Sequence, residues 1–95
     1  MPVVVILTAK AAPGRYAELL AMMAEALPDT VAQPGAELIR AGGDRAAETV
    51  TVFQIWDRIE SRQAYIDWRA ARGDLDRMGG MLREPARFDV MDLVF

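Results

Sequence analysis

The order of strand-like and helix-like segments is the feature that most limits the fold of this chain. Residues 3–7 are continuously apolar, and residues 48–56 alternate in the two-residue period of a half-buried strand. The segments that follow each of them carry apolar residues at the three-to-four-residue spacing of amphipathic helices. The resulting order is β-α-β-β-α-β, which favours a four-stranded antiparallel sheet with both main helices on one face.

The element boundaries are marked by turn residues and proline. Residues 13–14, 34–35 and 84–85 are Pro-Gly or Glu-Pro pairs that separate elements, and residues 41–44 are expected to form a hairpin loop. Pro28 either kinks the first helix or opens a second one, with helical structure continuing to residue 32. Asp57 or Ser61 is expected to cap the second helix. Strands are predicted at 2–10, 36–40, 48–56 and 87–95. Helices are predicted at 15–27, from the cap at Asp57 or Ser61 to the closing pair 72–73, and, shorter, at 74–83.

The expected inner faces follow from the two periodicities. On the third strand, alternation places Val50, Val52, Gln54 and Trp56 on one face. The apolar stripe of the first helix consists of Tyr16, Leu19, Leu20, Met23, Ala26 and Leu27, and the second helix is expected to turn Ala64, Tyr65, Trp68 and Ala71 inward.

The helices leave the other face of the sheet uncovered. A chain of 95 residues is expected to form one domain over 1–95 and buries only roughly 60–65% of its unfolded surface. It has no cysteine, which excludes disulfides, and no histidine. Chains that have neither residue type rarely hold a structural zinc ion. The simplest cover for the open face is the same sheet of a second copy, which predicts a homodimer.

Composition excludes several classes of function. The net charge of −3, from 11 basic and 14 acidic residues, argues against nucleic-acid binding. No apolar run is long enough to span a bilayer and no signal peptide pattern is present, so a cytoplasmic protein without membrane contact is expected. Without His or Cys the chain has no Ser-His or Cys-His nucleophile pair, and no carboxylate spacing indicates a metal site.

Six segments together carry a family resemblance, at 10–15, 19–20, 33–35, 52–56, 61–65 and Pro85. On these residues the chain resembles the antibiotic-biosynthesis-monooxygenase-type domains of the dimeric α+β barrel superfamily, in which the sheet is of the ferredoxin-like kind. This resemblance implies a homodimer with a ligand cleft between the sheet and the helices. Some members oxygenate aromatic polyketides without metal or flavin, some degrade haem, and others isomerise small molecules. The Asn and His of the haem-degrading branch have no match here, which argues against haem.

The candidate site residues are mostly aromatic. The resemblance matches Trp56 to a family tryptophan and Gln54 to a neighbouring polar position, so these two are the candidate catalytic residues. An indole N–H in a cleft could donate a hydrogen bond to a developing oxyanion. The alternative is that Trp56 is a core residue whose N–H donates to a backbone carbonyl. Tyr65 and Trp68 lie three residues apart on one helix and could form an aromatic box with Trp56, or fill the core.

Three further residues complete the candidate substrate-binding set. Tyr16 and Met23 share the inner face of the first helix, where core packing is the commoner role. Arg69 could bind an anionic substrate, or it could be a surface charge.

The leading hypothesis is a cofactor-independent monooxygenase-like enzyme that acts on an aromatic or enolisable small molecule, with no cofactor and no metal. The alternative is a non-oxidative isomerase or cyclase, or a ligand-binding dimer of the same fold. A structural dimer with a filled cleft is the third possibility. All three use the same fold, so the sequence does not separate them.

Overall fold

Four strands and three helices follow one another in the computed structural model, which describes residues 1–95. The main elements confirm the predicted order, with α3 as the predicted extra helix between α2 and the last strand. In chain order they are β1 (Val3–Lys10), α1 (Tyr16–Val31), β2 (Ala36–Asp44), β3 (Thr49–Trp56), α2 (Ile59–Ala71), α3 (Asp74–Gly79) and β4 (Arg87–Asp92).

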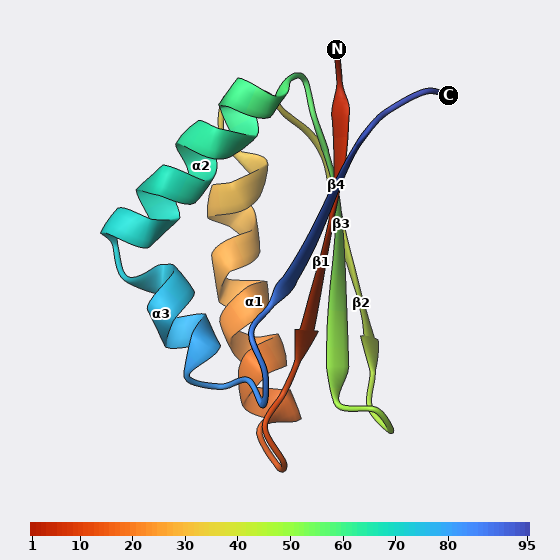
Figure 1. Cartoon of the computed structure of the whole chain (residues 1–95). Helices are drawn as coiled ribbons and strands as arrows, with labels where there is room; N and C mark the ends of the chain where they lie inside the picture. Colours follow the sequence, from red (N-terminus) through yellow and green to blue (C-terminus); the bar gives the residue numbers. More distant parts are fainter.

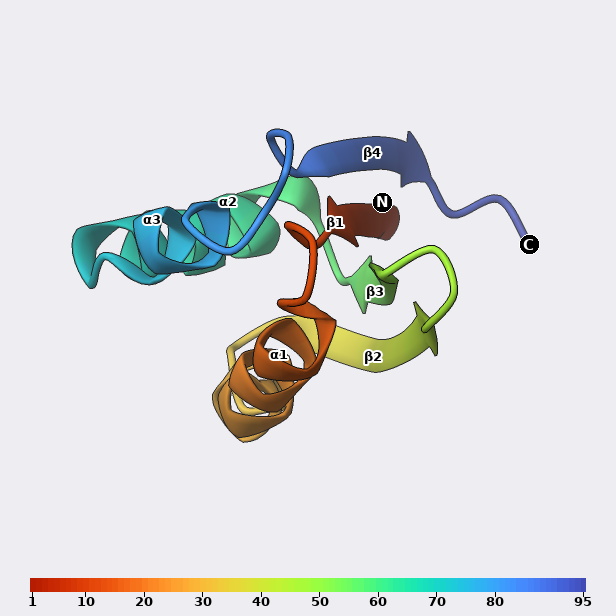
Figure 2. The same ribbon diagram turned by 90° about the horizontal axis from the view of Figure 1, so that it is seen from below.

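The strands form one antiparallel sheet in the order β2-β3-β1-β4, which is the ferredoxin-like arrangement. All three helices lie on the same side of this sheet (Figure 1). Within this helical layer, α1 lies near the β2 edge of the sheet, and α2 and α3 lie near the β4 edge (Figure 2). The continuous apolar run of the sequence is β1, which pairs with a neighbour on each side and buries Val3, Val4 and Val5.

The predicted alternation on β3 is confirmed. Val50, Val52, Gln54 and Trp56 are all buried beneath the helices, whereas Thr51 and the other odd-numbered residues of the strand are exposed or half-buried. Val5 pairs with Gln54 and Leu7 with Val52, so the apolar residues of β1 share this face. The core therefore lies between β1, β3 and the helices.

The expected hairpin loop at 41–44 is wrong, because β2 continues through these residues to Asp44 and the turn lies at 45–48. Gly43 is paired with Val50 inside the sheet, beneath the side chain of Tyr16. A Cβ at this position would collide with the Tyr16 hydroxyl. Glycine is present here for close packing within a strand, a use that its sequence context does not distinguish from a turn.

The helices differ from the prediction at their ends. α1 contains Pro28 and continues to Val31 without opening a second helix. α2 begins at Ile59 with Arg58 as its N-cap and no side-chain cap hydrogen bond, so the caps predicted at Asp57 and Ser61 are wrong. Asp57 lies one residue before the N-cap, with its backbone N–H bonded to the Gly35 carbonyl oxygen at 2.8 Å, and Ser61 lies inside the helix.

The inner face of α2 is also rotated relative to the expectation. Ala64 and Ala71 are exposed, Tyr65 and Trp68 are half-buried, and the one fully buried residue of the helix is Arg69. α3 stops at Gly79 and β4 at Asp92, both earlier than predicted. The hydrogen bonds that Arg69 donates to other helices, described below, account for this rotation.

No element of the chain covers the sheet face opposite the helices (Figure 1). One end of this face is apolar, whereas Thr51, Arg40 and Arg87 make its other end polar. Phe53 on β3 is 37% exposed and Met91 on β4 is 46% exposed. Their neighbours on this face include Ile6, Leu38 and Ile55, which are only half-buried. None of the three helices combines the length and apolar character required to cross a bilayer.

Candidate ligand cavity

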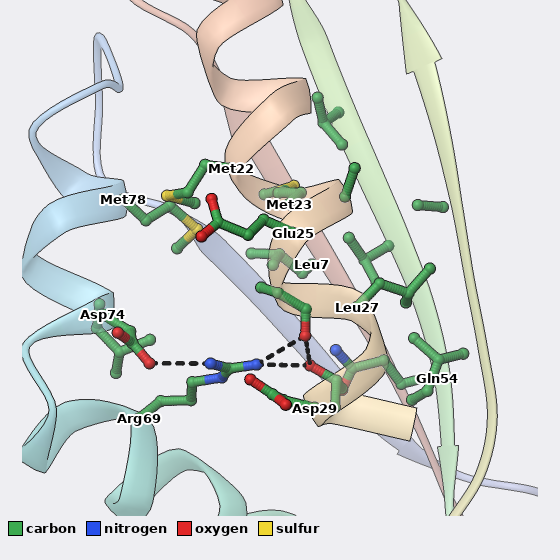
Figure 3. A pocket seen from close by; sticks show the side chains of 18 of the residues that line it. Leu7, Met22, Met23, Glu25, Leu27, Asp29, Gln54, Arg69, Asp74 and Met78 are labelled. Carbon is green, nitrogen blue, oxygen red and sulfur yellow. Dashed lines mark hydrogen bonds and ion pairs between the residues drawn. The ribbon is translucent and has the colours of Figure 1, made fainter. Parts of the chain in front are cut away.

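A cavity of about 320 Å³ lies between α1, the α2–α3 pair and the sheet. Two-thirds of its lining is hydrophobic, 16 of 24 residues, so a ligand inside it would be held mainly by apolar contact. Met22 and Met23 from α1 and Met78 from α3 meet at one end of it (Figure 3). Methionine side chains adapt readily to the shape of a bound molecule.

The floor of the cavity is the helix-facing side of the sheet. Leu7 from β1 and Val50, Val52 and Gln54 from β3 contribute to it, because the register of these two strands places them on one face. Gln54 is the polar member of this group and is 5% exposed. Its side chain points from the sheet toward the helices (Figure 3).

Arg69 joins the two helical walls of the cavity (Figure 3). Its Nη2 donates to the Ala26 carbonyl oxygen and to Thr30 Oγ1 on α1, both at 3.0 Å. Its Nε donates to the Tyr65 hydroxyl at 3.1 Å, and its Nη1 donates to Asp74 Oδ2 on α3 at 2.9 Å. One guanidinium, 5% exposed, therefore connects three helices.

The same network sets the charge at this end of the cavity. The hydrogen bond from Arg69 is the main cause that lowers the pKa of Asp74. Burial opposes the charge of Arg69, but its hydrogen bonds to Tyr65 and Asp74 outweigh this effect and raise its pKa. Four of the five N–H donors of Arg69 are used within the chain. Arg69 is thus mainly a tie between helices, although it lines the cavity.

Trp56 is fully buried and does not line the cavity. Its indole Nε1–H donates to Gln54 Oε1 at 2.9 Å. The N–H that was expected to face a ligand is therefore already used by a neighbouring side chain on the same face of β3. Of the two candidate catalytic residues, only Gln54 contacts the cavity.

The three aromatic residues form a packed row and not a box. The ring centroids of Trp56 and Tyr65 are 5.1 Å apart, and those of Tyr65 and Trp68 are 6.4 Å apart. Trp68 lies outside the cavity, with the Arg72 guanidinium 4.6 Å from its ring centroid. Tyr65 is the member of the row that reaches the cavity.

Tyr16 also lies outside the cavity. Its ring packs against Gly43, with the Arg45 guanidinium 5.5 Å from the ring centroid. The structure thus brings four of the predicted site residues to one cavity and leaves Tyr16, Trp56 and Trp68 outside it. The four are Met23, Gln54, Tyr65 and Arg69.

Several lining residues were missed from the sequence. Leu75 and Met78 of α3 lie three residues apart, which is a signal of a helical apolar face, but six residues are too few to show where that face points. Glu25 and Asp29 on α1 also line the cavity and lie one helical turn apart. No group of three or more acidic residues lies close enough together to hold a metal ion.

Comparison with known proteins shows likeness in structure only. No family model matches the sequence, and no curated protein is significantly similar to it. A protein of unknown function from Nitrosomonas europaea is 23% identical to this chain, with a TM-score of 0.86. The match covers 99% of this chain and 90% of the Nitrosomonas chain. A candidate antibiotic biosynthesis monooxygenase from Deinococcus radiodurans is 13% identical with a TM-score of 0.85, covering 98% and 93%.

A further solved structure, named as an antibiotic biosynthesis monooxygenase, is 14% identical with a TM-score of 0.85 and covers 98% of this chain and 99% of its own. At such identities the likeness establishes the fold and not the reaction.

Proposed function

Since the chain has the fold of antibiotic biosynthesis monooxygenases, we propose that it is a cofactor-independent monooxygenase of an aromatic or enolisable small molecule. The observation that carries this proposal is the cavity of about 320 Å³, with its mainly apolar lining, between the sheet and the helices. Its volume falls in the range of small-molecule sites. Its methionine side chains suit a flat ring, because sulfur makes favourable contacts with aromatic groups.

The chemistry requires little from the protein. An anthrone-type substrate loses a C–H proton, and the carbanion transfers an electron to O₂. The radicals combine to a peroxide on that carbon, and loss of water leaves a carbonyl, so that one O₂ converts the CH₂ group to C=O and H₂O. The protein has to orient the ring, exclude water and stabilise the anion. The groups proposed to take the proton are the carboxylates of Glu25 and Asp29, which line the cavity.

Oxygen uptake with a panel of hydroxyanthrones and quinols tests the reaction. We expect at least one compound to consume O₂ faster with the protein than without it, and to release the quinone in a one-to-one ratio with O₂. Product formed at the same rate under argon would reject the oxygenase and favour the isomerase or cyclase alternative.

A matched pair of variants tests whether the cavity is the site. Ala24 and Ala21 are both exposed on α1, but only Ala24 lines the cavity. Ala24→Trp should lower the rate at least tenfold by obstructing the cavity, whereas Ala21→Trp should leave it unchanged. Equal rates for the two variants would place the reaction elsewhere.

We also propose that the open sheet face pairs with a second copy of the chain. Supporting this, Phe53 and Met91 are large apolar residues on that face, 37% and 46% exposed. Stable interfaces bury roughly 800 Å² per partner, so the proposal requires most of this face to be buried in the dimer.

Sedimentation of the wild type and two variants tests the dimer. Phe53→Lys should shift the protein to a monomer at micromolar concentration. Val31→Lys, which replaces a 53% exposed residue of α1 away from the sheet, should not. A wild-type monomer, or a dimer in both variants, would contradict this interface.

A further inference from the structure

We infer that the cavity selects ligands with a carbonyl or enolate oxygen, which accepts a hydrogen bond from Gln54 Nε2, and that Trp56 is the positioning residue that aims this amide. The inference rests on the proposed function for the site, and it adds what the site recognises. It assigns the ligand contact to Gln54 and the orientation of that contact to Trp56.

The orientation of the Gln54 amide follows from donor and acceptor chemistry. An indole Nε1–H can only donate, so the atom that it meets at 2.9 Å must be the amide oxygen. If the amide were turned over, two N–H donors would face each other in the core, where an unpaired donor is costly. Trp56 is 0% exposed and packed against Tyr65, so turning its N–H elsewhere would require the surrounding core to move.

Because the amide oxygen of Gln54 faces Trp56, the position of its amide nitrogen is determined as well. Gln54 Nε2 makes no hydrogen bond within the chain, although the residue is 95% buried and lines the cavity. Of the three buried polar side chains, Thr30 and Arg69 are both bonded to each other and to further groups. Among these three side chains, Gln54 therefore has the one nitrogen that is left without a partner. The Nε of the half-buried Arg62 also lacks a partner, but Arg62 does not line the cavity.

A free donor on an apolar floor discriminates between ligands. A ketone, quinone or enolate oxygen can accept from it, whereas a hydrocarbon of the same shape would seal it off from water without a partner. Tyr65 Oη does not compete for the same oxygen, because it lies within hydrogen-bonding distance of Arg69 Nε and Thr30 Oγ1.

Binding of 9-fluorenone and fluorene, which have the same three-ring shape and differ in the carbonyl oxygen, measures this discrimination without any reaction. We expect wild-type protein to prefer fluorenone by about tenfold in Kd, the size that one satisfied buried donor supports. In ¹⁵N–¹H spectra, fluorenone should shift the Gln54 side-chain amide signals.

Two substitutions remove the donor in different ways. Gln54→Met keeps the side-chain length without any polar group. Gln54→Glu, measured at pH 8, keeps an acceptor for the Trp56 N–H and so preserves the core bond if the first variant folds poorly. In both variants the ratio of the Kd of fluorene to the Kd of fluorenone should fall close to one. A preference that survives in either folded variant would overturn the role of Gln54.

The positioning role of Trp56 has its own comparison. Trp56→Phe keeps an aromatic ring but lets the amide rotate, and should reduce the preference to about threefold and broaden the Gln54 amide signals. Leu19→Val also weakens the core, and Leu19 is 0% exposed but does not line the cavity. It should retain the tenfold preference. An unchanged preference in Trp56→Phe would overturn the positioning role.

The outcomes are independent of the monooxygenase proposal. Equal affinity of the wild type for the two compounds, or no binding of either, would overturn this inference even if the protein consumed O₂. A clear preference for fluorenone in a protein that consumes no O₂ would instead leave the recognition in place and remove the proposed reaction.

Discussion

The hydroxyl of Tyr16 on α1 lies directly over Gly43 on β2, in the space that a Cβ at this position would occupy. Tyr16 is 7% exposed, so its ring has little room to move aside. This contact ties the first turn of α1 to the edge of the sheet and explains why β2 carries a glycine one residue before its end.

The first prediction concerns this contact. Gly43→Ala should lower the free energy of unfolding by about 1–3 kcal/mol through overpacking. Gly42→Ala is the control, because a Cβ there meets nothing within 4 Å. Its effect should stay within about 0.5 kcal/mol. Chemical denaturation measures both, and a Tyr16→Phe background should relieve most of the Gly43→Ala penalty. Equal effects at the two glycines would contradict this view.

The second prediction concerns Arg69. Arg69→Met should destabilise the protein by about 3 kcal/mol, because it leaves partners on three helices without their donor. Arg69→Lys should not restore this loss, since a single ammonium cannot match the planar guanidinium. Arg72→Met removes a half-exposed partner of Asp74 and should cost at most about 1 kcal/mol. Urea unfolding curves that rank Arg72→Met with Arg69→Met would refute the assignment.

The third prediction is a dependence on pH. The pKa of Asp74 is lowered by its hydrogen bond from Arg69, so the folded state favours the ionised carboxylate. The stabilisation is therefore complete above the ordinary aspartate pKa of about 3.9 and is lost as the pH falls through the lower folded pKa. The stability difference between wild type and Asp74→Asn, about 1 kcal/mol at pH 7 because the carboxylate is partly exposed, should shrink toward acid pH.

Thermal or urea unfolding between pH 7 and pH 3 measures this difference. In an Arg69→Met background the dependence should be much weaker, because the main partner is gone. A difference that stays constant over this range in the wild-type background would show that the ion pair does not contribute.

The fourth prediction compares two glycines with left-handed backbone. Gly14 has φ +79° and Gly35 has φ +87°. Alanine at either position should cost roughly 1–2 kcal/mol for this conformation. A Cβ on Gly35 would in addition lie 2.5 Å from Asp57 Oδ1, whereas one on Gly14 meets nothing within 4 Å. We expect Gly35→Ala to be the more destabilising variant in thermal unfolding. The reverse order would contradict the close approach of Gly35 to the Asp57 side chain.

The candidate site was only partly predictable. Gln54 and Met23 follow from the period of a strand and of a helix, and both reach the cavity. Trp56 shares the face of Gln54, but the sequence does not show that its N–H is used by that neighbour. Trp68 looks inward from its spacing, yet it lies outside the cavity against Arg72. An aromatic side chain at a helical position fits either environment.

The sequence by itself determined the order of the elements and the two faces of β3, because these depend on residues a few positions apart. Only the tertiary structure decided the burial of Arg69, whose partner Ala26 is 43 positions away, and the packing of Gly43 beneath Tyr16. Periodicity describes which side of an element is apolar. Which polar group is buried depends on whether distant segments bring it a hydrogen-bond partner, and that is fixed only when the chain has folded.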